Sequence, residues 1–120
     1  MTYEQSTGLL RDDSGAIIGA GYSGHNEGRM NPVMQDQHNV GPLPQGKYVI
    51  GTARTDQRLG PLAMPLTPDP ANEMFGRSGF WIHGDSSAHP GLASDGCIVL
   101  AQPYRAMLAK MAGQVIEVVE

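Results

Sequence analysis

The sequence predicts a mainly β protein with one short helix near its C-terminus, folded as a single domain over residues 1–120. The chain length is close to the commonest size of one domain and is enough to bury a single core. The 16 glycines and 9 prolines indicate many turns, and charged residues make up only 17% of the chain. The apolar segments are short and rich in β-branched and aromatic residues, which is typical of strands.

The first half of the chain alternates strand-like segments with turn residues. Residues 6–10 and 16–22 flank the polar turn sequence Arg11-Asp12-Asp13-Ser14-Gly15, so a β-hairpin is expected there. Residues 23–40 are polar and show no sustained period, which predicts a long loop. Further strands are expected over residues 47–52, 80–83, 97–100 and 115–119.

Prolines mark the middle of the chain. Positions 61, 65, 68 and 70 are all proline. Because proline donates no N–H to a ladder, residues 56–77 are expected to form mostly a structured loop, with one helical turn over residues 70–75. The single helix is expected over residues 103–112, where Pro103 lies near its start and Gly113 follows its end.

The charge pattern excludes two classes of partner. The formal charge is −4 and no cluster of lysine or arginine is present, so neither nucleic acid nor an anionic membrane surface is expected as a partner. The first residues have no positive region followed by an apolar one, and no apolar run is long enough to span a bilayer. The expectation is a monomer made in the cytoplasm without a signal peptide.

One cysteine is the first candidate for chemistry. A single cysteine forms no internal disulfide, so Cys97 is either a small buried residue or a reactive thiol. The preceding Ser94-Asp95-Gly96 favours the reactive thiol. Gly96 permits a sharp turn in which the N–H groups of Gly96 and Cys97 point together at a carbonyl oxygen, as an oxyanion hole requires.

His83 is the expected base for this thiol. It ends the predicted strand 80–83, and a neighbouring strand 97–100 would bring Cys97 beside it. The imidazole would take the thiol proton and later protonate the leaving amine, while a backbone carbonyl near Gly84 holds the other ring nitrogen. His25, His38 and His89 lie in polar loops and are expected to be solvated.

Two motifs resemble a known family. The segments Phe80-Trp81-Ile82-His83-Gly84-Asp85 and Ser94-Asp95-Gly96-Cys97-Ile98-Val99-Leu100 resemble the signature of L,D-transpeptidase catalytic domains. Upstream, Gly41-Pro42-Leu43-Pro44-Gln45-Gly46-Lys47-Tyr48 looks like the turn and strand of that family. Other segments, at residues 22–24, 39–42 and 74–80, are similar to its compact branch, which includes type VI secretion effectors and phage or prophage proteins.

The resemblance implies a β-sandwich or barrel and a cysteine acyl-enzyme on Cys97. It implies stem peptides of peptidoglycan as substrates, with L,D-carboxypeptidase activity or D-amino-acid exchange as the reaction and with no metal or other cofactor. An immunity protein or a secretion apparatus would be a further partner. Delivery by such an apparatus or by phage lysis would take the protein to the periplasm or cell wall.

The remaining site residues follow from this resemblance and from two departures from it. The family pattern has histidine where this chain has Asp95, and a basic or amide residue where it has Val99. Substrate carboxylate binding must therefore come from elsewhere, and Arg77 and Arg105 are the candidates. Asp95 beside Cys97 should raise the thiol pKa unless it is held away to orient His83 or Ser94. The candidate substrate contacts are Arg77, Asp85, Tyr22 and Trp81. Asp85 could equally cap a loop, and Trp81 could belong to the core or form a wall of the cleft.

Two other functions remain open at this point. A metal hydrolase would use His83, Asp85 and His89 as zinc ligands, although their spacing in a loop is unlike well-defined zinc motifs and leaves Cys97 without a role. A non-catalytic cell-wall binding module would use the same cleft, with the thiol silenced by Asp95.

Overall fold

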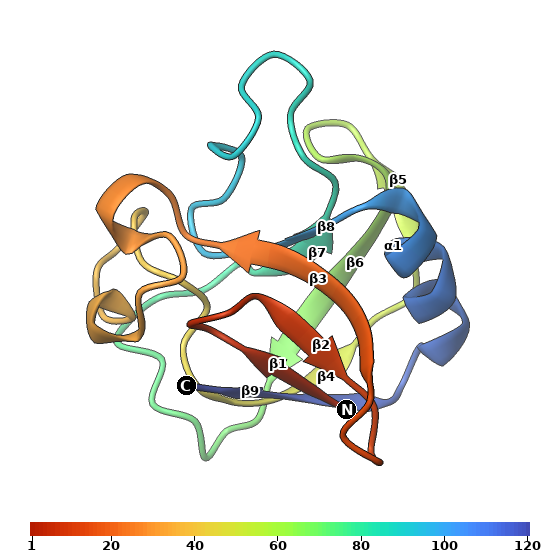
Figure 1. Cartoon of the computed structure of the whole chain (residues 1–120), viewed down its shortest axis with the longest axis horizontal. Coiled ribbons are helices and arrows are strands. Elements are labelled where there is room, and N and C mark those ends of the chain that lie inside the picture. The colour runs from red at the N-terminus through yellow and green to blue at the C-terminus, as the bar shows by residue number, and fades with distance from the viewer.

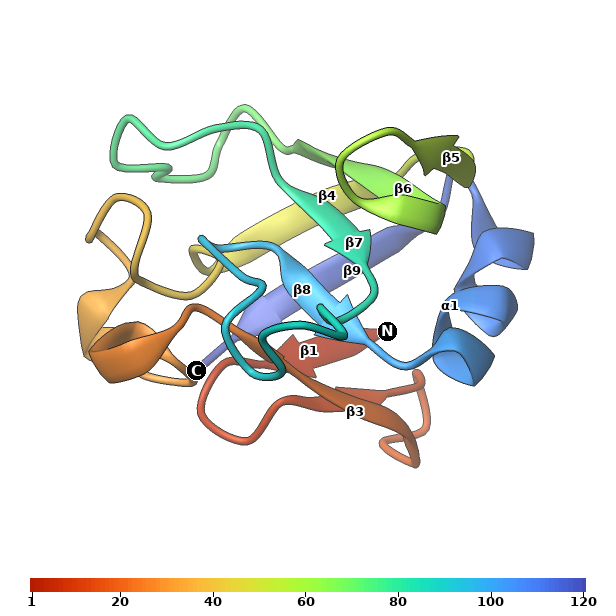
Figure 2. The same cartoon turned by 90° about the horizontal axis from the view of Figure 1, so that it is seen from above.

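A closed β-barrel is the architecture of the computed structural model, which describes all residues from 1 to 120. Its nine strands are β1 (Thr2–Glu4), β2 (Leu9–Arg11), β3 (Ile17–Ser23), β4 (Gly46–Ile50), β5 (Arg54–Asp56), β6 (Gly60–Pro68), β7 (Trp81–His83), β8 (Ile98–Leu100) and β9 (Val115–Val119). The order is β4-β9-β1-β2-β3-β8-β7-β6-β5, and a β4–β6 pairing closes eight of these strands into the barrel (Figures 1 and 2). The mainly β prediction is confirmed.

One helix, α1 (Gln102–Leu108), lies beside the barrel and continues into the 3₁₀ turn η3 (Ala109–Met111). It confirms the helix predicted over residues 103–112. Two further 3₁₀ turns, η1 (Asn26–Gly28) and η2 (Pro32–Met34), lie within the long loop expected between residues 23 and 40. No helix has the length and apolar character needed to cross a membrane.

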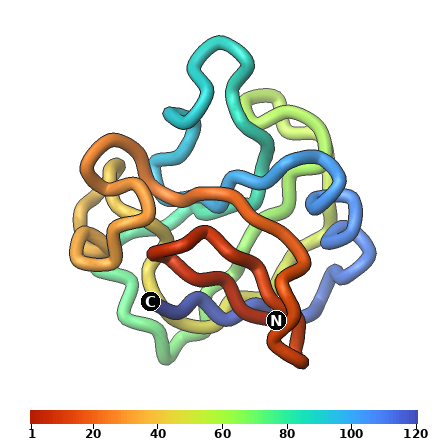
Figure 3. The backbone as a smooth tube through the Cα atoms, in the orientation of Figure 1, coloured from red at the N-terminus to blue at the C-terminus, as the bar shows by residue number.

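The barrel interior is filled by side chains that alternate along the strands. Fourteen buried residues form one cluster, and Tyr3, Tyr48, Ile82, Ile98 and Ile116 in it are fully inaccessible to solvent. This alternation leaves the other face of each strand on the outside of the barrel. The tube in Figure 3 shows both chain ends on the side of the molecule opposite the loop after β7. They lie at opposite ends of the parallel β1–β9 pair, because β1 starts the chain and β9 ends it.

The prediction that residues 56–77 form mostly a loop is wrong. Residues 60–68 form β6, the longest strand, which pairs with β4, β5 and β7. Pro65 is tolerated because it faces the gap between β4 and β5, where its carbonyl accepts the N–H of Gly51 at 2.8 Å. No helical turn forms over residues 70–75, and Thr2–Glu4 is a strand that sequence reasoning missed.

Candidate functional site

Two neighbouring strands, β7 and β8, place Cys97 and His83 on one face. They are parallel, with Ile82 opposite Ile98 and His83 opposite Val99. Because Ile82 and Ile98 point into the core, the residues that alternate with them, His83 and Cys97, belong to the outer face. Cys97 precedes β8 opposite Trp81, whose N–H donates to Cys97 Sγ at 3.3 Å. The thiol and the imidazole are thus diagonal neighbours that line the same pocket.

The ring of His83 is held in one orientation. Its Nδ1 lies 2.7 Å from the carbonyl oxygen of Gly84, where the sequence suggested a backbone carbonyl. A carbonyl only accepts, so Nδ1 carries the proton and Nε2 is left as the acceptor. Burial lowers the pKa of His83, outweighing the opposite effect of the Gly84 carbonyl. The side chain is therefore a neutral imidazole at pH 7, as a general base must be.

The thiol of Cys97 favours its protonated form. Burial raises the pKa of Cys97, while the Trp81 N–H and the positive charges of Arg58 and Arg77 act in the opposite direction. Asp95 contributes to the raised pKa, as expected, but less than burial does. A neutral thiol beside a neutral imidazole needs a proton transfer to become nucleophilic.

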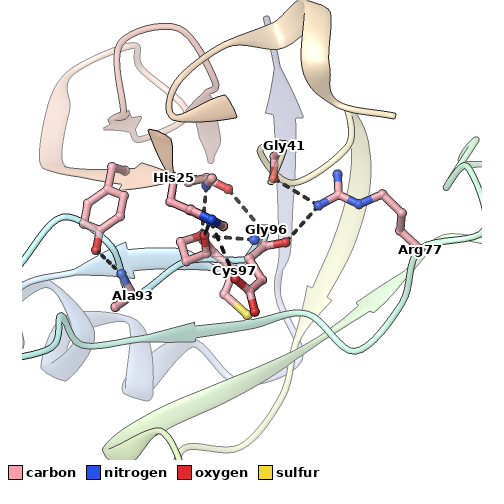
Figure 4. A network of polar contacts seen from close by, with 11 residues as sticks. His25, Gly41, Arg77, Ala93, Gly96 and Cys97 are labelled. Atoms are coloured by element: carbon pink, nitrogen blue, oxygen red, sulfur yellow. Dashed lines mark hydrogen bonds and ion pairs between the residues drawn. The ribbon is translucent and has the colours of Figure 1, made fainter. Parts of the chain in front are cut away.

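The turn that presents Cys97 is held by three side chains from other parts of the chain and by one of its own (Figure 4). Each of four consecutive carbonyl oxygens accepts a hydrogen bond. The pairs are Ser94 O with His25 Nδ1 at 2.8 Å, Asp95 O with Arg77 Nη2 at 3.0 Å, Gly96 O with Ser23 Oγ at 3.0 Å, and Cys97 O with Ser94 Oγ at 2.5 Å. The backbone from Ser94 to Cys97 is therefore held through its carbonyl groups.

Ser94 is the centre of this turn. Its buried hydroxyl donates to Cys97 O and accepts the N–H groups of Gly24 at 2.9 Å and Gly96 at 3.1 Å. The N–H of Gly96 is thus engaged inside the protein, in place of the oxyanion contact expected for it. The N–H of Cys97 donates to no acceptor in the protein. Of the two expected oxyanion donors, Cys97 is the one left available.

Gly96 is required for both conformation and space. Its φ is +137°, a backbone conformation that residues with a Cβ rarely adopt. A Cβ there would lie 2.5 Å from Arg77 Nη2 and 2.5 Å from the ring of Phe80. The glycine therefore lets Arg77 approach the turn closely.

Arg77 has a structural task in place of the expected carboxylate contact. It is buried, and its two terminal nitrogens donate four hydrogen bonds to backbone carbonyls, those of Gln35, Gly41, Pro42 and Asp95. The second candidate, Arg105, is also buried and donates to Leu100 O at 2.9 Å and Pro61 O at 2.7 Å. Neither guanidinium is free to bind a substrate carboxylate.

Tyr22 and Asp85 hold the loop after β7, and Asp85 also lines the hollow between this loop and residues 57–60. The Tyr22 hydroxyl donates to Asp85 Oδ1 at 2.6 Å and accepts the N–H of Ala93 at 3.0 Å. Asp85 also accepts the N–H of Ser86 at 2.8 Å and of Gly91 at 3.1 Å. For Asp85 the structure thus supports the loop-cap interpretation. This loop projects from the barrel at the top of Figure 1.

Trp81 and Asp95 also differ from expectation. Trp81 is half-buried and its ring lies under the guanidinium of Arg54, 4.7 Å from its centroid, outside the pocket that Cys97 lines. The Asp95 carboxylate is 71% exposed and lies 3.6 Å from His25 Nδ1. Asp95 therefore orients neither His83 nor Ser94 but lies beside His25, a loop residue that the sequence placed in solvent.

Two adjoining hollows meet at His83. One, of about 330 Å³, is lined by Cys97, His83, Asp95 and residues 76–80. The other, of about 470 Å³, runs between residues 57–60 and the loop after β7. Arg58, Leu59, His83 and Ala93 line both. An extended peptide could thus lie on both sides of the imidazole.

The alternative metal site is not assembled. No three side chains of histidine, cysteine, aspartate or glutamate lie close enough together to hold a metal ion, and His83, Asp85 and His89 do not form such a group. Sequence reasoning missed Ser23, His25 and Arg58 at this site. They lie in loops or at strand ends far from Cys97 in the chain, and no local pattern marks them.

Comparison with known proteins agrees with this geometry. No curated protein matches the sequence. Residues 18–119 match the sequence model of the Tlde1 domain, which covers β3 to β9 and the whole Cys97 and His83 site. The chain therefore belongs to the Tlde1 domain family, that of type VI secretion effectors with L,D-transpeptidase-like activity.

Proposed function

We propose that this protein modifies peptidoglycan through an acyl-enzyme on Cys97, acting on stem peptides as an L,D-carboxypeptidase, as an L,D-transpeptidase that exchanges D-amino acids, or as both. The observation that carries the proposal is the placing of the Cys97 thiol and the His83 imidazole in one pocket, with Nδ1 of His83 held by Gly84 O. Family membership gives the coarser statement of an enzymatic effector.

The first half of the reaction forms the acyl-enzyme. Nε2 of His83 takes the proton of Cys97, and Sγ attacks the carbonyl carbon of the scissile peptide bond. The oxygen of the tetrahedral intermediate accepts the free N–H of Cys97. As this intermediate collapses, the carbon–nitrogen bond breaks and the imidazolium protonates the leaving amine, so a thioester remains on Cys97.

The second half releases the acyl group. His83 takes a proton from water or from the amine of an incoming D-amino acid, which then attacks the thioester. The carbon–sulfur bond breaks, and the imidazolium returns its proton to the thiolate of Cys97. Water as the acceptor gives the shortened stem peptide, and an amine gives the exchanged one.

The test is mass spectrometry of defined muropeptides incubated with the native protein, with and without an added D-amino acid. Cys97→Ala and His83→Gln remove the proposed nucleophile and base, and His89→Ala serves as the matched control because this histidine is exposed in the loop after β7. We expect loss or exchange of a terminal D-alanine by the native protein and His89→Ala only. Equal activity in native protein and Cys97→Ala would refute thiol chemistry, and loss in His89→Ala would favour a metal site. Binding without product by folded native protein would favour a non-catalytic module.

The proposed place of action is the periplasm of a target cell, reached through a secretion apparatus, with an immunity protein protecting the producer. Family membership supports this delivery. Toxicity in bacteria is expected only when the protein is directed to the periplasm and only with Cys97 intact. Toxicity confined to the cytoplasm would contradict it.

A further inference from the structure

The structure leaves one cation free at the site. Of eight lysines and arginines, Arg58 is exposed and lines both hollows beside His83, while its guanidinium makes no hydrogen bond or ion pair with the protein. Each of the other arginines already has a partner. Arg11 forms an ion pair with Glu4, Arg29 and Arg54 stack over the rings of Tyr22 and Trp81, and Arg77 and Arg105 donate hydrogen bonds to backbone carbonyls. Neither lysine lines these two hollows.

The backbone at Arg58 is well defined. Arg58 lies in the turn that joins β5 to β6, and the carboxylate of Asp56 accepts the N–H groups of Arg58 at 2.9 Å and Leu59 at 3.0 Å. The turn ends at Gly60, whose φ is +85°. Asp56 therefore fixes the turn through the backbone and forms no ion pair with the guanidinium of Arg58.

Simple peptide chemistry gives this cation a ligand. In a carboxypeptidase reaction the leaving amine receives its proton from His83. The free carboxylate of that leaving residue is separated from its amine nitrogen by a single carbon atom. A guanidinium beside the imidazole is therefore within reach of this carboxylate, and its planar array of donors matches the two carboxylate oxygens.

We propose that Arg58 binds the terminal carboxylate of the leaving D-amino acid, so that the enzyme acts on the last residue of a stem peptide. This inference rests on the proposed function. The acyl part of the stem would lie in the hollow that Cys97 lines, and the leaving residue would lie past His83, with Arg58 at the junction. In the exchange direction the same guanidinium holds the carboxylate of the incoming D-amino acid.

The test compares two tetrapeptide stems that differ only at their end, one with a free C-terminal D-alanine and one with its amide. We expect the native protein to favour the free acid in kcat/KM by about tenfold or more, which is the size of one charge-assisted contact. Arg58→Gln should bring the ratio of acid to amide close to one, and Arg58→Lys should keep part of it. Arg54→Gln, on the same hairpin, is the matched control and should keep the native ratio.

The ratio isolates this contact because the charge of Arg58 also favours the Cys97 thiolate, an effect that acts equally on both substrates. A native enzyme without preference, or Arg58→Gln with the native ratio, would overturn the inference while leaving the thiol chemistry standing.

Binding of the two peptides to Cys97→Ala, measured by calorimetry, distinguishes failure of the Arg58 inference from failure of the proposed thiol chemistry. A preference for the acid that disappears with Arg58→Gln supports the inference even without turnover. No such preference overturns it.

Discussion

Replacing Ser94 by alanine should destabilise the turn of residues 94–97 that presents Cys97. The buried hydroxyl takes part in three hydrogen bonds, with Cys97 O, Gly24 N and Gly96 N. Removing it leaves one carbonyl and two N–H groups without partners in a region closed to solvent. At about 1 kcal/mol for each lost bond, the free energy of unfolding should fall by about 3 kcal/mol. For a domain of this size, that corresponds to a fall in melting temperature of about 10 °C.

Urea unfolding followed by circular dichroism measures this change, and Ser87→Ala is the matched control. Ser87 lies in the same loop but is exposed and makes no hydrogen bond through its side chain, so its change should stay within about 0.5 kcal/mol. Below the melting temperature of both proteins, Ser94→Ala should also lower kcat, because the Cys97 backbone loses a support. A loss of stability under about 1 kcal/mol with an unchanged m-value would refute the reasoning.

Two further predictions concern the thiol pair and Arg77. Because burial lowers the pKa of His83 and raises that of Cys97, kcat/KM should fall only as pH drops below the ordinary histidine value of 6.5. The rate of Cys97 alkylation by iodoacetamide should climb with pH and should still be rising at pH 9.0, because the thiol is not yet fully ionised there. An alkylation rate that has already levelled off at neutral pH would contradict this. The folded protein should also lose stability as pH falls below 6.5, since the histidine of the unfolded chain binds a proton at a higher pH than His83 does in the fold. Arg77→Lys replaces a guanidinium that donates to four backbone carbonyls by a single ammonium group. The free energy of unfolding, measured with urea, should therefore fall by about 2 kcal/mol. Activity on the acid and amide stems should fall by the same factor, and a selective loss on the acid would instead place Arg77 at the substrate.

Local pattern was enough for most of the barrel. Residues 115–119 were predicted as a strand and form β9 with the same limits, because four of its five residues are β-branched, Glu117 being the exception. Proline content was misleading at β6. A proline in a strand loses a hydrogen bond only if its nitrogen faces a paired neighbouring strand. At Pro65 the nitrogen faces the gap between β4 and β5, so no such bond is lost.

The site divides in a similar way. The motif around Cys97 and the strand ending in His83 predicted two residues that the structure places in one pocket, because each motif lies within a few residues of the chain. Arg77 shows the limit of such reasoning. A positive charge near the motif suggests an anion contact, but this guanidinium enters the protein and binds main-chain carbonyls from two distant segments.

The sequence by itself determined the fold class, the family resemblance and the prediction of Cys97 and His83 as diagonal neighbours on β7 and β8, since periodicity, turn residues and short motifs are local properties. Only the tertiary structure decided which polar groups are already satisfied. Tyr22, Asp85, Arg77 and Arg105 have their partners in other segments, and Arg58 does not. Hydrogen bonds between groups far apart in the chain exist only once the barrel has closed, so the group left free to bind a substrate can be found only there.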